Sequence, residues 1–369
     1  MATTPLGRAV AERGKHWLHA ADAPAGLLDM GGDTLAGITP DAVRDATIDA
    51  LNKHLGDHYA RRPGIAPLCR AVADKLAEAD IAVDADKDVV IAGGPQEARF
   101  VALRALAAGK TVFVPQPAPV DSYRAAVDFA GGTLTWFDPA SALPDTNGGL
   151  LVLPNPNPAT GQVVDHATLA HLAQWAVAAD MSVIADETAA PLLRPDVALT
   201  HMATLPGMAE RTLTLGSFAA IPGMGAWQVA WFAGARSLVT PVRDLKQAMT
   251  ICSPAASQYA ALAGVAQTAT DVAPQQIERL EAITALLDEA GVPYREPHTF
   301  AYVVADVAAL GGGDAFAACA AHHGVQVASG SAWGAPNTVR ITANAATLGD
   351  ALPALEAVLA DLTPKEAQP

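Results

Sequence analysis

Short apolar runs alternate with amphipathic segments along most of the chain. Seven apolar runs within residues 88–234 predict buried strands: "DVVIAG", "TVFVPQP", "TLTWFD", "GLLVLP", "MSVIADE", "RTLTLGS" and "WQVAWFAG". The segments between most of them have the spacing of apolar positions that is typical of helices. Strands that are apolar throughout and alternate with helices predict an α/β fold, with a mostly parallel seven-stranded sheet buried on both faces.

Several helix boundaries can be predicted from local signals. The segment "TPDAVRDATIDALNKHL" is expected to be helical, with Thr39 as its N-cap and Pro40 in its first turn. The segment "SYRAAVDFAGG" is expected to form another helix, which would include Tyr123.

The pattern changes after residue 265. A long helical region leads to "TFAYVVADV", "VQVAS" and "TVRITA", which read as strands, and to the helical segments "GGDAFAACAAHHG" and "TLGDALPALEAVLADL". We therefore predict a large domain over residues 46–265 and a smaller α+β domain made of residues 1–45 and 266–369.

Composition narrows the class of protein. The 369 residues are too many for one simple core, and 51% hydrophobic with 17% charged residues is typical of a globular protein. The formal net charge of −15 disfavours binding to nucleic acid or to an anionic membrane surface. We find no apolar run long enough to span a bilayer and no apolar segment typical of a signal peptide near the first residue.

The cysteines and histidines predict neither a disulfide framework nor a metal site. Cys69, Cys252 and Cys319 lie far apart and form no Cys-x-x-Cys pair, which fits a reducing cytoplasm. The pair His322 and His323 in "AHHG" is interpreted as a helix end on the surface.

Unusual residues gather where the predicted strands end. Gly93 and Gly94, Pro115, Asn155, Asp186 and Ser217 each follow or close such a strand. Ligands in open α/β sheets bind at the carboxyl ends of the strands, so these positions predict a site there.

Taken together, six segments resemble the class I/II aminotransferases, which are pyridoxal-phosphate enzymes of fold type I. They are "YARRPGIAPLCRAVADKL", "IAGGPQEA", "PNPNPATGQV", "VIADE", "LGSFAA…WQVAW" and "VASGSAWGAPNTVRITA", in family order from about Asp29 to Leu362. The resemblance implies the aminotransferase fold and a homodimer with its site at the subunit interface. It also implies a cofactor that is held by a Schiff base to a lysine.

That lysine is missing from its expected position. The family pattern is Ser-x-x-Lys with an Arg eight residues after the Lys; here Ser217 is followed by Ala220 and then by Gln228. No lysine occurs between residues 111 and 245, and Lys246 in "VRDLKQAM" is expected to be solvated. The sequence therefore predicts a degenerate member without the imine-forming residue and without the phosphate-binding Arg.

Three further cofactor contacts of the family are altered. Pro158 stands where the family has the Asn that bonds the cofactor ring oxygen, and Ala189 stands where it has a Tyr. Pro119 takes the place of the aromatic residue that stacks on the ring; Tyr123 could be a displaced substitute, but the helical pattern favours a place in the following helix.

Other family positions are retained. The turn of Gly93, Gly94 and Pro95 opens a helix and could hold an anion, to which Ser217 could add a hydroxyl, although such glycines can also serve only to turn the chain. Asp186 matches the carboxylate that pairs with the pyridine nitrogen; its alternative roles are to cap a helix or to pair with a neighbouring residue.

Two retained residues lie outside that turn. Tyr59 matches the Tyr that reaches the phosphate from a partner subunit, or packs at an interface without a ligand. Arg340 matches the Arg that grips the substrate carboxylate, or forms a structural ion pair.

Two functional hypotheses follow. In the first, the chain is a non-transaminating binding or regulatory protein, or an enzyme that uses the old cleft without a cofactor, with a small carboxylate or phosphate as ligand. In the second, it is an enzyme that binds pyridoxal phosphate or pyridoxamine phosphate non-covalently and acts on an amino acid or keto acid. The second needs a general base other than Asp186, and no His or Lys occupies the matching position.

Overall fold

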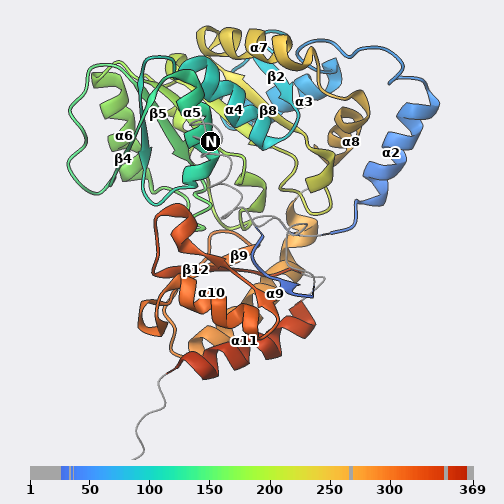
Figure 1. The fold of residues 1–369 in the computed structure, drawn as a ribbon. Helices are drawn as coiled ribbons and strands as arrows, with labels where there is room; N and C mark the ends of the chain where they lie inside the picture. Colours follow the sequence, from blue (N-terminus) through green and yellow to red (C-terminus); the bar gives the residue numbers. More distant parts are fainter. Residues whose placement is uncertain (1–25, 33–34, 36, 266–268, 345–347, 364–369) are drawn as a thin grey trace, which may run out of the picture.

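The computed structural model describes residues 26–32, 35, 37–265, 269–344 and 348–363. Two bodies are evident in Figure 1, a large one with a central sheet and a smaller one formed by the C-terminal part of the chain. Residues 1–25, which the sequence assigned to the smaller domain, lie outside the described residues.

The large body contains the predicted seven-stranded sheet. Its strands, in spatial order, are β2 (Val89–Ala92), β8 (Ala230–Gly234), β7 (Thr212–Ser217), β6 (Ser182–Asp186), β5 (Leu150–Pro154), β3 (Thr111–Pro115) and β4 (Thr133–Phe137). Strand β8 runs antiparallel to both of its neighbours, and all other pairs are parallel. The prediction of a mostly parallel sheet is therefore confirmed.

Helices cover both faces of this sheet. Residues of α4 (Pro95–Leu106), α5 (Val120–Ala130) and α7 (Arg236–Thr250) share one apolar core with the strands. Residues of α6 (His166–Ala178) and α3 (Ala66–Ala77) lie in other apolar clusters with strand residues. Because both faces are covered, the strands lack the alternation of polar and apolar residues seen in half-exposed sheets.

The smaller body is built around an antiparallel sheet in the order β11 (Ala328–Ser329), β12 (Thr338–Thr342), β9 (Tyr302–Asp306). Helices α9 (Ala269–Glu289), α10 (Gly313–His322) and α11 (Leu348–Leu362) share one apolar core with its strands and lie mostly below them in Figure 1. The early strand β1 (Leu28–Asp29) pairs in parallel with β10 (Val325–Gln326), so the start of the described chain joins this body.

The remaining helices are short or lie at the edge of the bodies. They are α2 (Asp41–Asn52) and α8 (Ala255–Val265), with the short 3-10 turns η2 (Ala190–Leu192), η3 (Met202–Thr204), η4 (Ala209–Arg211), η5 (Gly225–Trp227), η6 (Ala308–Leu310) and η7 (Gly330–Trp333). The predicted boundary at residue 265 coincides with the end of α8, and that at residue 45 falls within α2. The boundaries themselves stay a prediction. Within the described residues, no helix has both the length and the apolar composition needed to cross a membrane.

Thr39 does not cap α2 as the sequence suggested. Pro40 occupies the N-cap position and no side chain caps the helix. The Thr39 hydroxyl instead donates to the carbonyl of Gly223 at 3.0 Å and accepts from Trp227 Nε1 at 3.1 Å. Long-range hydrogen bonds thus engage the Thr39 hydroxyl, which local propensity predicted as the cap of the helix.

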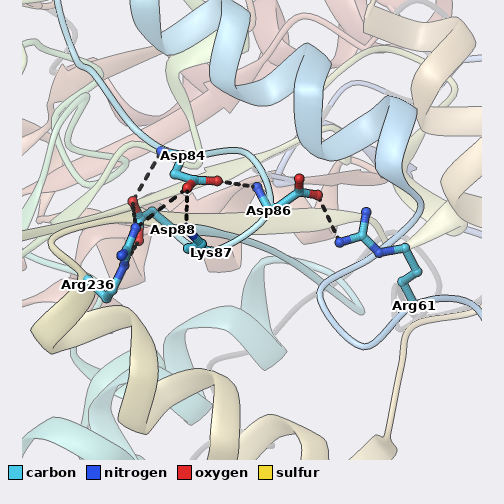
Figure 2. A network of polar contacts seen from close by, with 6 residues as sticks. All are labelled: Arg61, Asp84, Asp86, Lys87, Asp88 and Arg236. Carbon is cyan, nitrogen blue, oxygen red and sulfur yellow. Dashed lines mark hydrogen bonds and ion pairs between the residues drawn. The ribbon is translucent and has the colours of Figure 1, made fainter.

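A network of charged side chains lies just before β2, at the end of that strand away from the Gly93–Gly94 turn (Figure 2). The Arg236 guanidinium, at the first residue of α7, binds the Asp88 carboxylate through two contacts of 2.8 and 3.0 Å. Lys87 pairs with Asp84 at 3.3 Å, and Arg61 pairs with Asp86 at 2.8 Å. The Arg236 contacts tie α7 to the segment before β2, and the Arg61 contact ties that segment to the one between α2 and α3, so the network has a structural role.

Candidate ligand site at the carboxyl edge of the sheet

Asp186 is the last residue of β6, and its side chain is only 2% exposed. Three side chains surround its carboxylate. Arg99 donates from Nε to Oδ2 at 2.6 Å, Tyr123 donates its hydroxyl to Oδ2 at 2.8 Å, and Thr188 donates its hydroxyl to Oδ1 at 2.6 Å. Both carboxylate oxygens are therefore engaged by groups of the chain itself.

The charge of Asp186 is balanced by Arg99. Burial by itself would raise the pKa of the Asp186 carboxyl, but the Arg99 guanidinium, with hydrogen bonds from Arg99, Thr188 and Tyr123, holds that pKa below its usual value. Arg99 also donates to the Thr188 hydroxyl. The carboxylate thus stays ionised inside the protein.

Tyr123 lies in α5, where the helical pattern placed it. Its side chain is 1% exposed, and burial together with the neighbouring Asp186 charge raises the pKa of its hydroxyl well above the usual value. It remains a neutral hydrogen-bond donor to Asp186.

The turn before α4 is closed by a side chain of the same helix. Gly94 is the N-cap with φ 92°, which favours glycine, and Pro95 at the first helical position has no N–H to offer. The free N–H of Gly93 donates to the Glu97 carboxylate. An internal carboxylate therefore binds the turn that the sequence singled out as an anion site.

Lys246 is not solvated, contrary to the sequence prediction. Its side chain is 0% exposed on the face of α7 that packs against α4, with Nζ 4.0 Å from Glu97 Oε1 and 3.1 Å from the Thr250 hydroxyl. Burial lowers the pKa of the Lys246 ammonium, and the Glu97 charge counteracts this. Leu238, Val242 and Lys246 recur at intervals of four residues, so the helical period placed Lys246 on the buried face.

The Ser217–Ala220 turn is closed. The Ser217 hydroxyl accepts from the backbone N–H of Ala219 at 2.9 Å. Ala220 is 5% exposed and belongs to an apolar cluster. The other buried members of this cluster are Leu35, Leu192, Ala273, Phe300, Ala301 and Tyr302. This cluster packs around residue 220, the position where the family has its lysine.

Gln228 follows η5 in the left-handed conformation, with φ 51°. Its amide donates to the carbonyl of Gly225 at 2.7 Å, and its Oε1 lies so close to Gly94 that a Cβ there would clash with it. Residue 228, where the family pattern has a phosphate-binding Arg, therefore lies at the glycine turn. Its side chain in this protein is a neutral amide.

The other altered positions offer no polar side chain to a ligand. Pro119 is the N-cap of α5, Ala189 is the N-cap of η2, and Pro158 lies in the loop after β5. In that loop, Asn155 accepts from the backbone N–H of Val164 at 2.9 Å, so its side chain serves the loop itself.

Arg340 on β12 is a buried cation, 7% exposed. Its Nη2 donates to the carbonyl of Gly31 at 2.9 Å, and its guanidinium carbon lies 5.2 Å and 4.9 Å from the ring centroids of Tyr302 and Trp333. Its Nε has no hydrogen-bond partner, and Arg340 makes no ion pair with the described part of the chain. The structural ion pair considered for it is therefore not found among these residues.

Tyr59 stands apart from these residues. It is 84% exposed and follows α2. Within this single chain, nothing described brings it to Asp186 or to the glycine turn.

A second buried acid lies beside Asp186. Glu187 Oε2 is 2.7 Å from His201 Nδ1, with side-chain exposures of 5% and 22%. Burial raises the pKa of the Glu187 carboxyl, and the hydrogen bond to Glu187 raises the pKa of His201. Because the pKa of each group is raised, the pair of Glu187 and His201 readily holds a proton.

Sequence reasoning missed Arg99, Glu97 and the pair of Glu187 with His201. One signal was available for Arg99. A cation in the first turns of a helix opposes the helix dipole, so Arg99 near the start of "PQEARFVALRAL" called for an acidic partner. No comparable signal linked Glu187 to His201, because the contact depends on how the loop before β7 folds back.

A cavity of about 320 Å³ is lined by residues of both bodies, among them Pro117, Thr160, Tyr294, Asp306 and Thr338. Asp186, Ala220 and Arg340 are not among its lining residues, although Val304, the strand neighbour of Arg340, is one of them.

Comparison with known proteins defines the class. Residues 27–357 match the family model described as aminotransferase class I and II, so the chain belongs to that family. It is 27% identical over 337 residues to an aspartate aminotransferase of Musicola paradisiaca, covering 85% of this chain and 84% of that one. It is 29% identical over 320 residues to an arginine–pyruvate transaminase of Pseudomonas aeruginosa, covering 80% and 79%.

Solved structures of aminotransferases have the same fold as this chain. N-succinyldiaminopimelate aminotransferase from Mycobacterium tuberculosis superposes with a TM-score of 0.81 at 26% identity, covering 97% of each chain. Aromatic aminotransferase from Pyrococcus horikoshii gives 0.83 at 25% identity, covering 96% of this chain and 99% of that one. The likeness therefore extends over both bodies of the molecule.

Family members depend in general on pyridoxal phosphate, and the residues described here do not fit that cofactor in the way the family pattern implies. Asp186, which would pair with the pyridine nitrogen, is bound to Arg99. The N–H of Gly93 at the phosphate turn is bound to Glu97. Ala220 and Gln228 supply neither an amine nor a cation.

Proposed function

We propose that this chain is an aminotransferase-fold protein that has lost transamination and uses its old cleft to bind a ligand or to act without pyridoxal phosphate. The observation that carries the proposal is the 2.6 Å contact from Arg99 to Asp186. The Arg99 guanidinium binds the Asp186 carboxylate, which in the family pattern would pair with the cofactor ring.

Changes at the other anchoring positions support the same conclusion. The lysine and arginine positions hold Ala220 and Gln228 at the family spacing, and Glu97 caps the phosphate turn. Losing a charge-assisted contact such as the phosphate Arg costs about 1.5–3 kcal/mol of binding. Loss of several contacts together favours a protein that no longer retains the cofactor.

A small carboxylate is the ligand class we propose for the cleft. Arg340 is a buried cation whose Nε has no hydrogen-bond partner and which makes no ion pair within the described residues. Guanidinium groups bind carboxylates through paired hydrogen bonds, and a ligand carboxylate would compensate this buried charge.

We propose a homodimer as well, as the resemblance implies. Large apolar side chains are exposed along and around α2: Ile38, Ile48, Leu51, Leu55 and Tyr59. Several large exposed apolar side chains on one segment are typical of an interaction site, and a second copy is the partner that the family resemblance favours. We also propose a cytoplasmic location, because Cys69, Cys252 and Cys319 are free thiols.

The alternative, non-covalent use of pyridoxal phosphate or pyridoxamine phosphate, has less support. It needs Asp186 free to face the cofactor and a separate general base. Arg99, Tyr123 and Thr188 already engage Asp186, and Lys246 is buried against Glu97.

Calorimetric titration combined with a transamination assay tests the proposal. We expect succinate or 2-oxoglutarate to bind the wild type, Arg340→Met to weaken that binding at least tenfold, and no amino transfer to occur with added pyridoxal phosphate. Arg104→Met, at an exposed site on α4, serves as the charge-matched control. Amino transfer by the wild type would contradict the loss of transamination, and equal carboxylate binding by Arg340→Met would contradict the ligand site.

A further inference from the structure

Three potential metal ligands meet on the surface of the smaller body. They are Cys319, His323 and Asp361, and their donor atoms all lie within 4.8 Å of one another. The His323 Nε2 and Asp361 Oδ2 atoms are 2.7 Å apart.

The fold places these groups together by simple geometry. Cys319 and His323 are four residues apart at the end of α10, so they lie on the same face of consecutive turns. Asp361 comes from the last turn of α11, which packs against α10. His322 lies beside the cluster, with its ring centroid 5.7 Å from that of His323.

We propose that Cys319, His323 and Asp361 bind a zinc ion, with water or His322 as a fourth ligand. Thiolate, imidazole and carboxylate are all zinc ligands, and the thiolate and imidazole favour zinc over magnesium or calcium. The sequence pattern alone predicted only a helix end at His322 and His323.

The distances are close to those that a tetrahedral zinc site needs. Bonds of about 2.0–2.3 Å place the ligand atoms of such a site roughly 3.4 Å apart. The widest separation in the cluster is at most 4.8 Å, and the shortest contact is 2.7 Å. Small side-chain rotations bring both separations to the value that zinc needs, because the Asp361 side chain is 64% exposed and has room to rotate.

Charge supports a cation at this place. The chain has a net charge of −15, which attracts cations in general. Zinc binds the deprotonated thiolate and the neutral imidazole, so affinity should increase with pH.

The chain contains a matched control for the His–carboxylate contact. His54 Nδ1 lies 2.8 Å from Asp57 Oδ2 on the surface of the large body. The thiol is what distinguishes the Cys319 cluster from this pair, so a comparison of the two places separates thiolate ligation from adventitious binding.

Cobalt substitution on the untagged full-length chain tests the proposal. We expect one equivalent of Co²⁺ to give a sulfur-to-metal charge-transfer band, which added Zn²⁺ abolishes by displacement. Cys319→Ser should remove the band, and His323→Gln and Asp361→Asn should each weaken zinc binding at least tenfold. Circular dichroism confirms that each variant is folded.

Cys252→Ser and His54→Gln are the control variants and should leave the band and the affinity unchanged. The proposal is overturned if bound Co²⁺ shows no thiolate band, if Cys252→Ser removes the band as completely as Cys319→Ser, or if Cys319→Ser binds zinc as tightly as the wild type.

Discussion

The guanidinium of Arg99 on α4 lies 2.6 Å from the carboxylate of Asp186 at the end of β6, and both side chains are largely buried. In the aminotransferase pattern that carboxylate is kept for the cofactor. Here it completes a contact between a helix and the central sheet. The predictions that follow depend on this contact.

Replacing Arg99 by Leu should destabilise the fold by about 3–5 kcal/mol at neutral pH, because it leaves the buried Asp186 carboxylate without its cation. Urea unfolding of Arg99→Leu, Asp186→Leu and the double variant measures the coupling, and the double variant should lose less than the sum. Arg236→Leu, which breaks a half-exposed pair with Asp88, should cost clearly less. Additive single effects would contradict a coupled pair.

Acid should remove the contribution of this pair. The folded pKa of Asp186 is lower than the ordinary value of 3.8, so its stabilisation is present above that value and is lost as pH falls through the folded pKa. The difference in unfolding free energy between wild type and Arg99→Leu should therefore be constant near neutral pH and shrink in acid. A difference that grows in acid would show that Asp186 is not the charged partner.

The pair of Glu187 and His201 should act in the opposite direction. Because the folded pKa of His201 is raised above 6.5, its stabilisation is complete below that value and is lost as pH rises through the folded pKa. Thermal unfolding of wild type and His201→Gln should differ most in mildly acidic buffer and converge in alkaline buffer. His171→Gln, outside this pair, serves as control. A gap that does not change with pH would contradict the shared proton.

Restoring the family residues should not be enough to restore cofactor binding. Ala220→Lys introduces an amine into a closed apolar cluster, at a cost of about 1–3 kcal/mol, and Gln228→Arg returns a cation to the glycine turn. We expect strong lysine-bound cofactor absorbance only when Arg99→Leu is added, since Arg99 engages Asp186. Equal absorbance from the double and triple variants would show that Arg99 is no obstacle.

The exposed apolar surface around α2 should control assembly. Leu51 is 52% exposed on this surface, so Leu51→Asp should convert a wild-type dimer into a monomer by light scattering. Val177, 41% exposed on α6, provides the control, and Val177→Asp should remain dimeric. A monomeric wild type would contradict the proposed homodimer.

The strands and most helices could be predicted because apolar runs and helical spacing are local signals. The site was harder to predict because its partners come from distant segments. Asp186 could be picked out at a strand end, but its pairing with Arg99 joins residues 87 positions apart. Lys246 was misplaced because its charge was given more weight than the helical period that directs it inward. Thr39 failed as a cap because Gly223 and Trp227 compete for its hydroxyl.

The most direct test of the central claim is the absorption spectrum of the wild-type chain after incubation with excess pyridoxal phosphate and passage through a gel-filtration column. If Arg99 holds Asp186 and no lysine stands at residue 220, the protein should elute colourless, with all of the cofactor in the small-molecule fraction. A stoichiometric near-ultraviolet or visible band that travels with the protein would contradict the account.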